Sequence, residues 1–146
     1  MSAIRRTLTL SCSCAHAFRV FTERMDAWWP PSHRKHPNAR MLIEPRVGGR
    51  FYERAPSGEE VERGEVLAWD PPHALRYSWW PGSSDAPTEV AVTFRAEGDR
   101  TIVEVTHTPG SSDAASWPKR AERFIGGWSA VLPAFADAVE QREEDA

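Results

Sequence analysis

The feature that most constrains the fold is a succession of six β-like segments between residues 41 and 108. These segments are rich in valine, threonine and aromatic residues, and read MLIEPRV, GGRFYERA, VERGEVLAWD, HALRYSWW, TEVAVTFRAE and RTIVEVTHT. Turn-forming residues separate them, for example Pro56-Ser57-Gly58 and Asp70-Pro71-Pro72. Because the connections are short, the segments are predicted to be neighbouring strands of an antiparallel sheet.

The N-terminal region predicts one more strand and then a helix. Residues 3–11 alternate threonine with leucine, which favours a strand with Ile4, Leu8 and Leu10 directed inward. Ser13 is a suitable N-cap, and apolar residues follow it at the spacing of one helix face, namely Cys14, Ala17, Phe18, Phe21 and Met25. This helix is expected to end near residues 24–26. Pro30-Pro31 cannot continue it, so Trp28-Trp29 should lie at its end or on one further short turn.

The alternation within the strands predicts an apolar sheet face that a helix must cover. Inward positions are expected at Leu75, Tyr77, Trp79, Val90, Val92, Phe94, Val103, Val105 and His107. The covering element is the C-terminal segment, in which apolar residues recur at helical spacing after a predicted Ser116 cap: Phe124, Trp128, Val131, Leu132, Phe135 and Val139. A twisted sheet of about seven strands curls, and one helix cannot fill the concavity. We therefore predict an α+β fold with a cavity between sheet and helix.

Length and charge limit the classes of function. The chain has 146 residues, a common size for one domain, so a single domain over residues 1–146 is expected. It contains 18 Lys and Arg against 21 Asp and Glu, so no basic field favours nucleic acid as a partner. No stretch approaches 18 apolar residues and no signal-peptide core follows Arg5-Arg6, so we expect no membrane insertion and a cytoplasmic location.

Metal-ligand residue types occur in two short clusters. Cys12, Cys14 and His16 form one, and His33 and His36 the other. Neither has the spacing of a structural zinc site, and two cysteines two positions apart are too close for a relaxed disulfide. We therefore predict free thiols, imidazoles exposed in a proline-rich loop, no metal site and no cofactor.

Aromatic residues distributed over every predicted wall point to a small-molecule pocket. Seven tryptophans are more than a core of this size usually holds. Apolar walls with a few polar groups are what a small-molecule site requires. The residues predicted to contact a hydrophobic or aromatic ligand are Trp28, Trp29, Phe51, Trp69, Tyr77, Trp79, His107 and Trp128. For the adjacent tryptophans, one ring is expected under the long helix and the other at the pocket mouth.

Catalysis is a second possibility with less support in the sequence. The chain lacks a G-x-S-x-G elbow, an H-E-x-x-H motif and a phosphate-binding loop. Candidate acid–base groups exist on the predicted strands, namely Glu53, Glu65, Tyr77 and His107. A cyclase- or hydrolase-like reaction would need His107 or a carboxylate to face the cavity.

The chain resembles the family named for the activator of heat-shock protein 90 ATPase homologues. The resemblance runs from about Arg5 to Val139 through "WWPP", "VGGRFYER", "GEVLAWDPPHALRYSW", "TEVAVTFRAEGDRTIVEVTH" and "GGWSAVL". Its most distinctive pieces are Gly48-Gly49, Asp70-Pro71-Pro72 and Gly127-Trp128. That family is part of the START-like (SRPBCC, helix-grip) superfamily, which also contains the birch-pollen allergen, polyketide cyclases and lipid-transfer domains.

The resemblance implies a fold and a general function. The implied fold is a curved seven-stranded antiparallel sheet that grips a long C-terminal helix, with two short helices after the first strand. Superfamily members bind sterols, lipids, hormones or aromatic polyketides between sheet and helix, so the resemblance implies a hydrophobic ligand. The eukaryotic activator has an additional N-terminal domain for chaperone binding, and nothing in this sequence corresponds to it.

Three functional hypotheses result. The leading one is a non-enzymatic protein that binds a hydrophobic or aromatic small molecule in the cavity. The second is a cyclase- or hydrolase-like enzyme that uses the same cavity. The third is a chaperone-associated interaction module in a stress response, and an exposed aromatic residue could equally mark a homodimer contact.

Overall fold

The computed structural model describes residues 3–34, 36, 38–80, 87–110 and 117–145. In chain order, the strands, helices and one 3₁₀ turn (η1) are β1 (Ile4–Leu10), α1 (Cys14–Thr22), α2 (Met25–Trp28), η1 (Pro31–His33), β2 (Arg40–Ile43), β3 (Arg50–Arg54), β4 (Glu60–Asp70), β5 (Ala74–Trp79), β6 (Thr88–Glu97), β7 (Arg100–Thr108) and α3 (Trp117–Asp145). All predicted strands are confirmed. The predicted Ser116 cap of the C-terminal helix lies outside the described residues.

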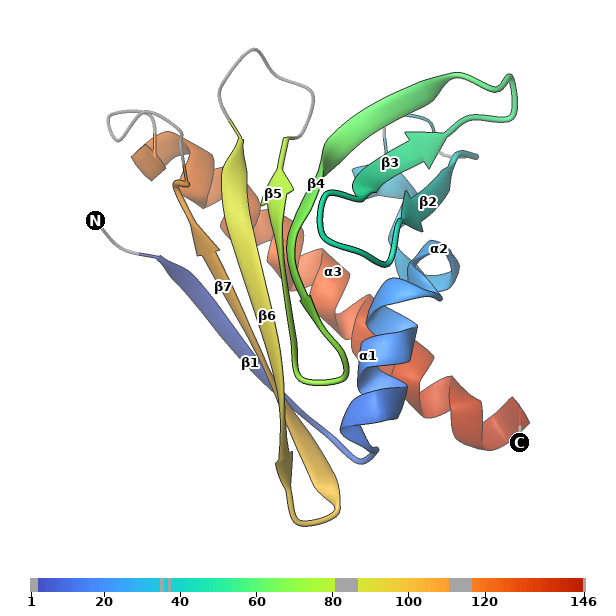
Figure 1. The fold of residues 1–146 in the computed structure, drawn as a ribbon, viewed down its shortest axis with the longest axis vertical. Helices are drawn as coiled ribbons and strands as arrows, with labels where there is room; N and C mark the ends of the chain where they lie inside the picture. Colours follow the sequence, from blue (N-terminus) through green and yellow to red (C-terminus); the bar gives the residue numbers. More distant parts are fainter. Residues whose placement is uncertain (1–2, 35, 37, 81–86, 111–116, 146) are drawn as a thin grey trace.

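The seven strands form one antiparallel sheet in the order β1-β7-β6-β5-β4-β3-β2. β1 closes against β7, with Ile4 opposite His107, and the other strands follow as a meander. Figure 1 shows the sheet curling along its width, with β2 and β3 bent away from the plane of β6 and β7. The predicted curved helix-grip architecture is thereby confirmed.

Two irregularities in β4 produce much of this curl. Phe51 of β3 pairs with Gly64, but the next residue, Tyr52, pairs with Glu62, so Arg63 is an extra residue in the ladder. A second shift lies between Val66 and Ala68, where β4 faces β5. A β-bulge bends its strand and increases the local twist. Gly64 is required at the first bulge because a Cβ there would lie 1.8 Å from the carbonyl oxygen of Ser78.

The helix after β1 is divided in two. As predicted, Ser13 caps α1, and its hydroxyl accepts a 3.1 Å hydrogen bond from the backbone N–H of His16. The helix end expected near residues 24–26 from the spacing is wrong, because α1 ends at Thr22 and Met25 begins the separate helix α2; the two short helices that the family resemblance implied are confirmed. Trp28 is the last residue of α2 and Trp29 is its C-cap, so the alternative of one further short turn is the observed one.

The connection between β2 and β3 is longer than predicted. The expected strand MLIEPRV ran to Val47, with the break at Gly48-Gly49, whereas β2 ends at Ile43 and β3 begins at Arg50. Glu44 accounts for the break, because its carboxylate accepts a 2.8 Å hydrogen bond from the backbone N–H of Arg50 and its backbone N–H bonds to the carbonyl of the same residue. Gly48, with φ of 83°, supplies a left-handed backbone conformation within this turn.

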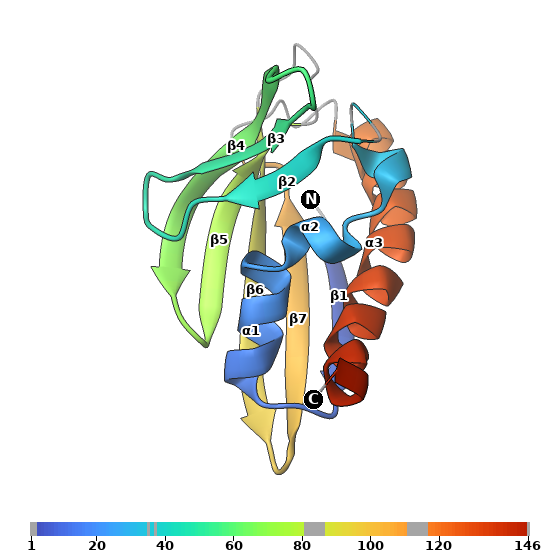
Figure 2. The same cartoon turned by 90° about the vertical axis from the view of Figure 1, so that its right-hand side faces the viewer.

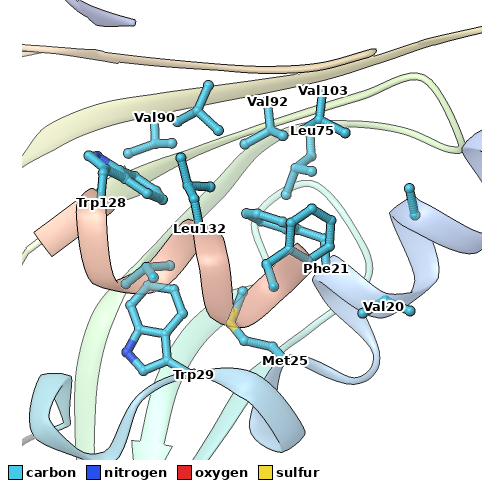
Figure 3. Packing of buried hydrophobic residues seen from close by; sticks show 14 of the residues in the cluster. Val20, Phe21, Met25, Trp29, Leu75, Val90, Val92, Val103, Trp128 and Leu132 are labelled. Atoms are coloured by element: carbon cyan, nitrogen blue, oxygen red, sulfur yellow. The ribbon is translucent and has the colours of Figure 1, made fainter. Parts of the chain in front are cut away.

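The core lies between the concave sheet face and α3. Figure 2 shows α3 along one side of the molecule, with α1 and α2 closing the space between it and the strands. Val90, Val92, Val103 and Val105 are all buried, as the alternation predicted. Figure 3 shows Trp128 and Leu132 of α3 on the side of the cluster facing Val90. Within the part of the chain that is described, no helix is long and apolar enough to cross a membrane.

Candidate functional site

A cavity of about 740 Å³ lies between the sheet and α3. Its volume falls within the range of about 300–1,000 Å³ that is usual for small-molecule sites. Its described lining residues come from the α2–η1 region, β4, β5, β7 and α3, and are Trp29, Ser32, His33, Arg34, Val61, Arg63, Tyr77, Trp79, Trp80, His107, Arg123, Phe124, Gly126, Gly127, Trp128 and Val131. The predicted hollow between sheet and helix is therefore present.

Tryptophans from three elements form the walls. Trp29 at the end of α2 and Trp79 of β5 have ring centroids 5.6 Å apart. Trp128 of α3 lies against His107 of β7, with centroids 6.0 Å apart. Large flat surfaces of this kind favour flat apolar molecules, because aromatic rings gain from offset or edge contacts in addition to burial.

Tyr77 lines the cavity, and its hydroxyl is shielded from solvent. The ring packs edge-on against Phe51, with centroids 5.1 Å apart. The hydroxyl has no hydrogen-bond partner among the described residues. Burial raises the pKa of Tyr77, so the group is a neutral O–H donor. An unsatisfied buried polar group of this type destabilises a protein by about 1–3 kcal/mol.

His107 is held in one tautomer by its two neighbours. The indole N–H of Trp128 can only donate, and it donates to Nδ1 of His107 at 3.0 Å. The ring proton is therefore on Nε2, which donates to Oγ1 of Thr88 at 2.7 Å. Burial, together with the positive charge of Arg120, lowers the pKa of His107 to about 3. His107 faces the cavity as a neutral residue whose two nitrogens are both engaged.

Two arginines border the cavity, the buried Arg63 and the half-buried Arg34, each with an acidic partner. The guanidinium of Arg63 bonds to the fully buried carboxylate of Glu53, with Nε to Oε2 at 2.6 Å. Arg34 contacts the carboxylate of Asp26 at 2.8 Å and also donates to the carbonyl of Trp29. These bonds hold the β4 wall and the α2–η1 wall in place, and supply polar atoms at the cavity edge.

The structure brings together five of the eight residues predicted to contact a ligand. Trp29, Tyr77, Trp79, His107 and Trp128 line the cavity. As expected for the tryptophan pair, one ring packs under the long helix, and it is that of Trp28, whose centroid is 5.2 Å from that of Phe135.

The other three predicted residues, Trp28, Phe51 and Trp69, lie outside the cavity lining. Phe51 is fully buried behind the wall, against Trp29, Tyr77 and Trp79. Trp69 is half-buried against Phe18, with centroids 5.1 Å apart. Whether any of the eight residues contacts a ligand stays a prediction.

Sequence reasoning missed several lining residues. His33 and Arg34 belong to the proline-rich loop that was interpreted as exposed, but both are half-buried and both border the cavity. Arg63 was missed because the bulge at this position changes the alternation of β4. A signal for His33 and Arg34 exists, since Pro30-Pro31 turns the chain back immediately after the two tryptophans.

The candidate metal ligands have other partners. Nε2 of His16 donates to the carbonyl of Val139 at 3.2 Å, and Nε2 of His36 bonds to the carboxylate of Glu59 at 2.6 Å. Cys12 and Cys14 are not joined by a disulfide. Among the residues with described positions, no group of three His, Cys, Asp or Glu side chains could hold a metal ion.

Comparisons with known proteins find a matching family and a related solved structure. Residues 11–140 match the family described as Activator of Hsp90 ATPase homolog 1-like protein. An anthrahydroquino-γ-pyrone synthase, Txn09, complexed with a compound abbreviated SUM, is 33% identical, with 94% of this chain and 97% of that chain covered and a TM-score of 0.61.

More distant solved structures share the fold alone. Protein NE0264 from Nitrosomonas europaea is 13% identical, with 97% and 96% of the two chains covered and a TM-score of 0.69. Protein CV1439 from Chromobacterium violaceum is 21% identical, with 96% and 99% covered and a TM-score of 0.68. A comparison with curated proteins found no match. The family match covers most of the chain, and the chain therefore belongs to the Activator of Hsp90 ATPase homolog 1-like family.

Proposed function

We propose that this protein binds a hydrophobic or aromatic small molecule in the cavity between the sheet and α3. The observation that carries the proposal is the convergence of Trp29, Trp79 and Trp128, from three separate elements, on one cavity of about 740 Å³. A core that needed only to be filled would leave no such space, because protein interiors are close-packed. The fold of the family, a curled sheet around a helix, is in general a fold that binds hydrophobic molecules, which supports the proposal.

Calorimetric titration with rigid tricyclic aromatic compounds tests this proposal. Trp79→Leu removes a cavity wall, and Trp69→Leu is its matched control, because Trp69 is also half-buried but lies against Phe18 outside the cavity lining. Loss of one aromatic contact should weaken binding by about 2- to 10-fold in Trp79→Leu. Trp69→Leu should bind as the unmodified protein does. Equal losses in both variants would contradict the proposed location.

Catalysis in the same cavity is the second candidate, favoured by one observation. The 33% identical relative is a synthase. In this protein the neutral hydroxyl of Tyr77, a cavity-lining residue, has no described partner, whereas both nitrogens of His107 are engaged. Mass spectrometry of aromatic compounds recovered after incubation separates the candidates. A binding protein returns each compound unchanged, whereas an enzyme returns a product whose yield falls in Tyr77→Phe.

A further inference from the structure

The hydroxyl of Tyr77 is fixed in place by packing alone. The backbone of Tyr77 is held between two strands, opposite Val66 of β4 and Val90 of β6. Its ring lies edge-on against Phe51, and the side chain is fully buried. Among the described residues, none offers its hydroxyl a hydrogen bond. Tyr77 thus lines the cavity with a covered hydroxyl donor that has no described partner.

Three other N–H donors of the aromatic wall are already bonded within the protein. The indole N–H of Trp128 donates to His107, and the imidazole N–H of His107 donates to Thr88. The indole N–H of Trp29 donates to the carbonyl of His33 at 3.2 Å. These donors cannot bond to a ligand without breaking a bond within the protein, and Tyr77 can.

We propose that the hydroxyl of Tyr77 donates a hydrogen bond to an acceptor oxygen of the bound molecule, such as a ring carbonyl. The site would thereby select oxygenated aromatic compounds over hydrocarbons of the same shape. An acceptor is required because a molecule with donors alone would leave the hydroxyl proton unpaired. This inference rests on the proposed function. Since neighbouring side chains now shield the hydroxyl, binding should also shift the adjacent aromatic rings.

Matched pairs of tricyclic compounds isolate this hydrogen bond. Fluorenone has a carbonyl group where fluorene has a methylene group, and xanthone and xanthene differ in the same way. The unmodified protein should bind each ketone more tightly than its hydrocarbon or ether counterpart. Tyr77→Phe should weaken ketone binding by about 2- to 10-fold and leave the counterpart unchanged. Tyr52→Phe is the control, because the Tyr52 hydroxyl accepts a 3.2 Å hydrogen bond from Arg54 and lies outside the described cavity lining.

An infrared measurement distinguishes direct contact from a change in packing. The carbonyl stretch of bound fluorenone labelled with ¹³C should lie at lower frequency in the unmodified protein than in Tyr77→Phe, since a hydrogen bond weakens the C=O bond. Identical frequencies, or equal affinity for both members of each pair, would overturn the inference and leave the proposed function intact. Failure of all four compounds to bind would overturn both.

Discussion

The indole N–H of Trp128 on α3 donates a 3.0 Å hydrogen bond to Nδ1 of His107 on β7. This bond joins the long helix to the sheet across the cavity wall and determines which nitrogen of His107 carries the proton. The chain of bonds continues from Nε2 through Thr88 to the carbonyl of Trp79. His107 faces the cavity, as the hypothesis of catalysis required, but a general base needs a free lone pair, and the one on Nδ1 is occupied.

The low pKa of His107 predicts a specific dependence of stability on pH. With a folded pKa of about 3 and an unfolded value of 6.5, the unfolded state binds one more proton between these limits. The free energy of unfolding should therefore fall as pH falls below 6.5, by up to about 1.4 kcal/mol per pH unit from this residue. Urea denaturation at a series of pH values between 7.5 and 4 measures this fall in the free energy of unfolding.

The control for this prediction is His107→Gln, which cannot titrate. Its free energy of unfolding should be lower at pH 7.5 because the bonds to Trp128 and Thr88 are disturbed. Its free energy of unfolding should nevertheless change less steeply with pH than that of the unmodified protein. Parallel slopes in the two proteins would show that His107 takes up its proton in the folded state at an ordinary pH.

The adjacent residues Trp28 and Trp29 should respond differently to substitution. The N–H of Trp28 donates to the carbonyl of Val20 at 2.7 Å inside the core, so Trp28→Phe should lower the free energy of unfolding by about 1–3 kcal/mol and leave ligand affinity unchanged. Trp29→Phe alters the cavity lining and should weaken binding. Thermal unfolding and calorimetry measure the two effects, and the reverse pattern would refute the assignment.

Removing the hydroxyl of Tyr77 should stabilise the ligand-free protein. Tyr77→Phe deletes a buried polar group with no described partner, and the free energy of unfolding should rise by about 1–3 kcal/mol. Tyr52→Phe loses a hydrogen bond from Arg54, so its free energy of unfolding should instead fall by about 0.5–1.5 kcal/mol. Chemical denaturation of both variants checks the opposite signs. A loss of stability in Tyr77→Phe would mean that the hydroxyl has a partner in the folded protein.

The buried ion pair between Glu53 and Arg63 should be sensitive to loss of one partner. Glu53→Gln leaves the guanidinium buried without its counter-charge and should destabilise the protein by about 3–5 kcal/mol. The double variant Glu53→Leu/Arg63→Met should recover most of this loss of stability. Burying an apolar pair does not require charged groups to be taken out of water. Glu97→Gln, at an exposed ion pair with Arg95, is the control and should have little effect.

The strands and their inward faces could be predicted because their pattern is local. Val90, Val92 and Phe94 alternate with polar residues, and this alternation alone identifies the buried side of β6. The family resemblance added the order of the elements and the helix-grip arrangement. The family resemblance also implied two short helices after the first strand, but the residue spacing alone did not show the break, because Phe21 and Met25 keep the spacing of one helix face across it.

The residues that line the cavity could not all be predicted, because the lining depends on contacts between elements that are distant in sequence. Trp28 and Trp29 are neighbours in sequence, yet one packs on Phe135 and the other lines the cavity. Counting outward from Val66 in steps of two would place Arg63 on the outer face of β4. The bulge opposite Phe51 and Tyr52 places it inside, beside Glu53. That the chain forms a single domain over residues 1–146 stays a prediction.

The indole N–H resonances of the seven tryptophans test the central claim most directly. In a ¹H–¹⁵N spectrum, assigned by single Trp→Phe variants, titration with fluorenone should shift the resonances of Trp29, Trp79, Trp80 and Trp128, which line the cavity. Those of Trp28 and Trp69 should stay in place, because they lie in the core and against Phe18. Shifts confined to Trp28 and Trp69, or no shift at saturating ligand, would contradict a binding site between the sheet and α3.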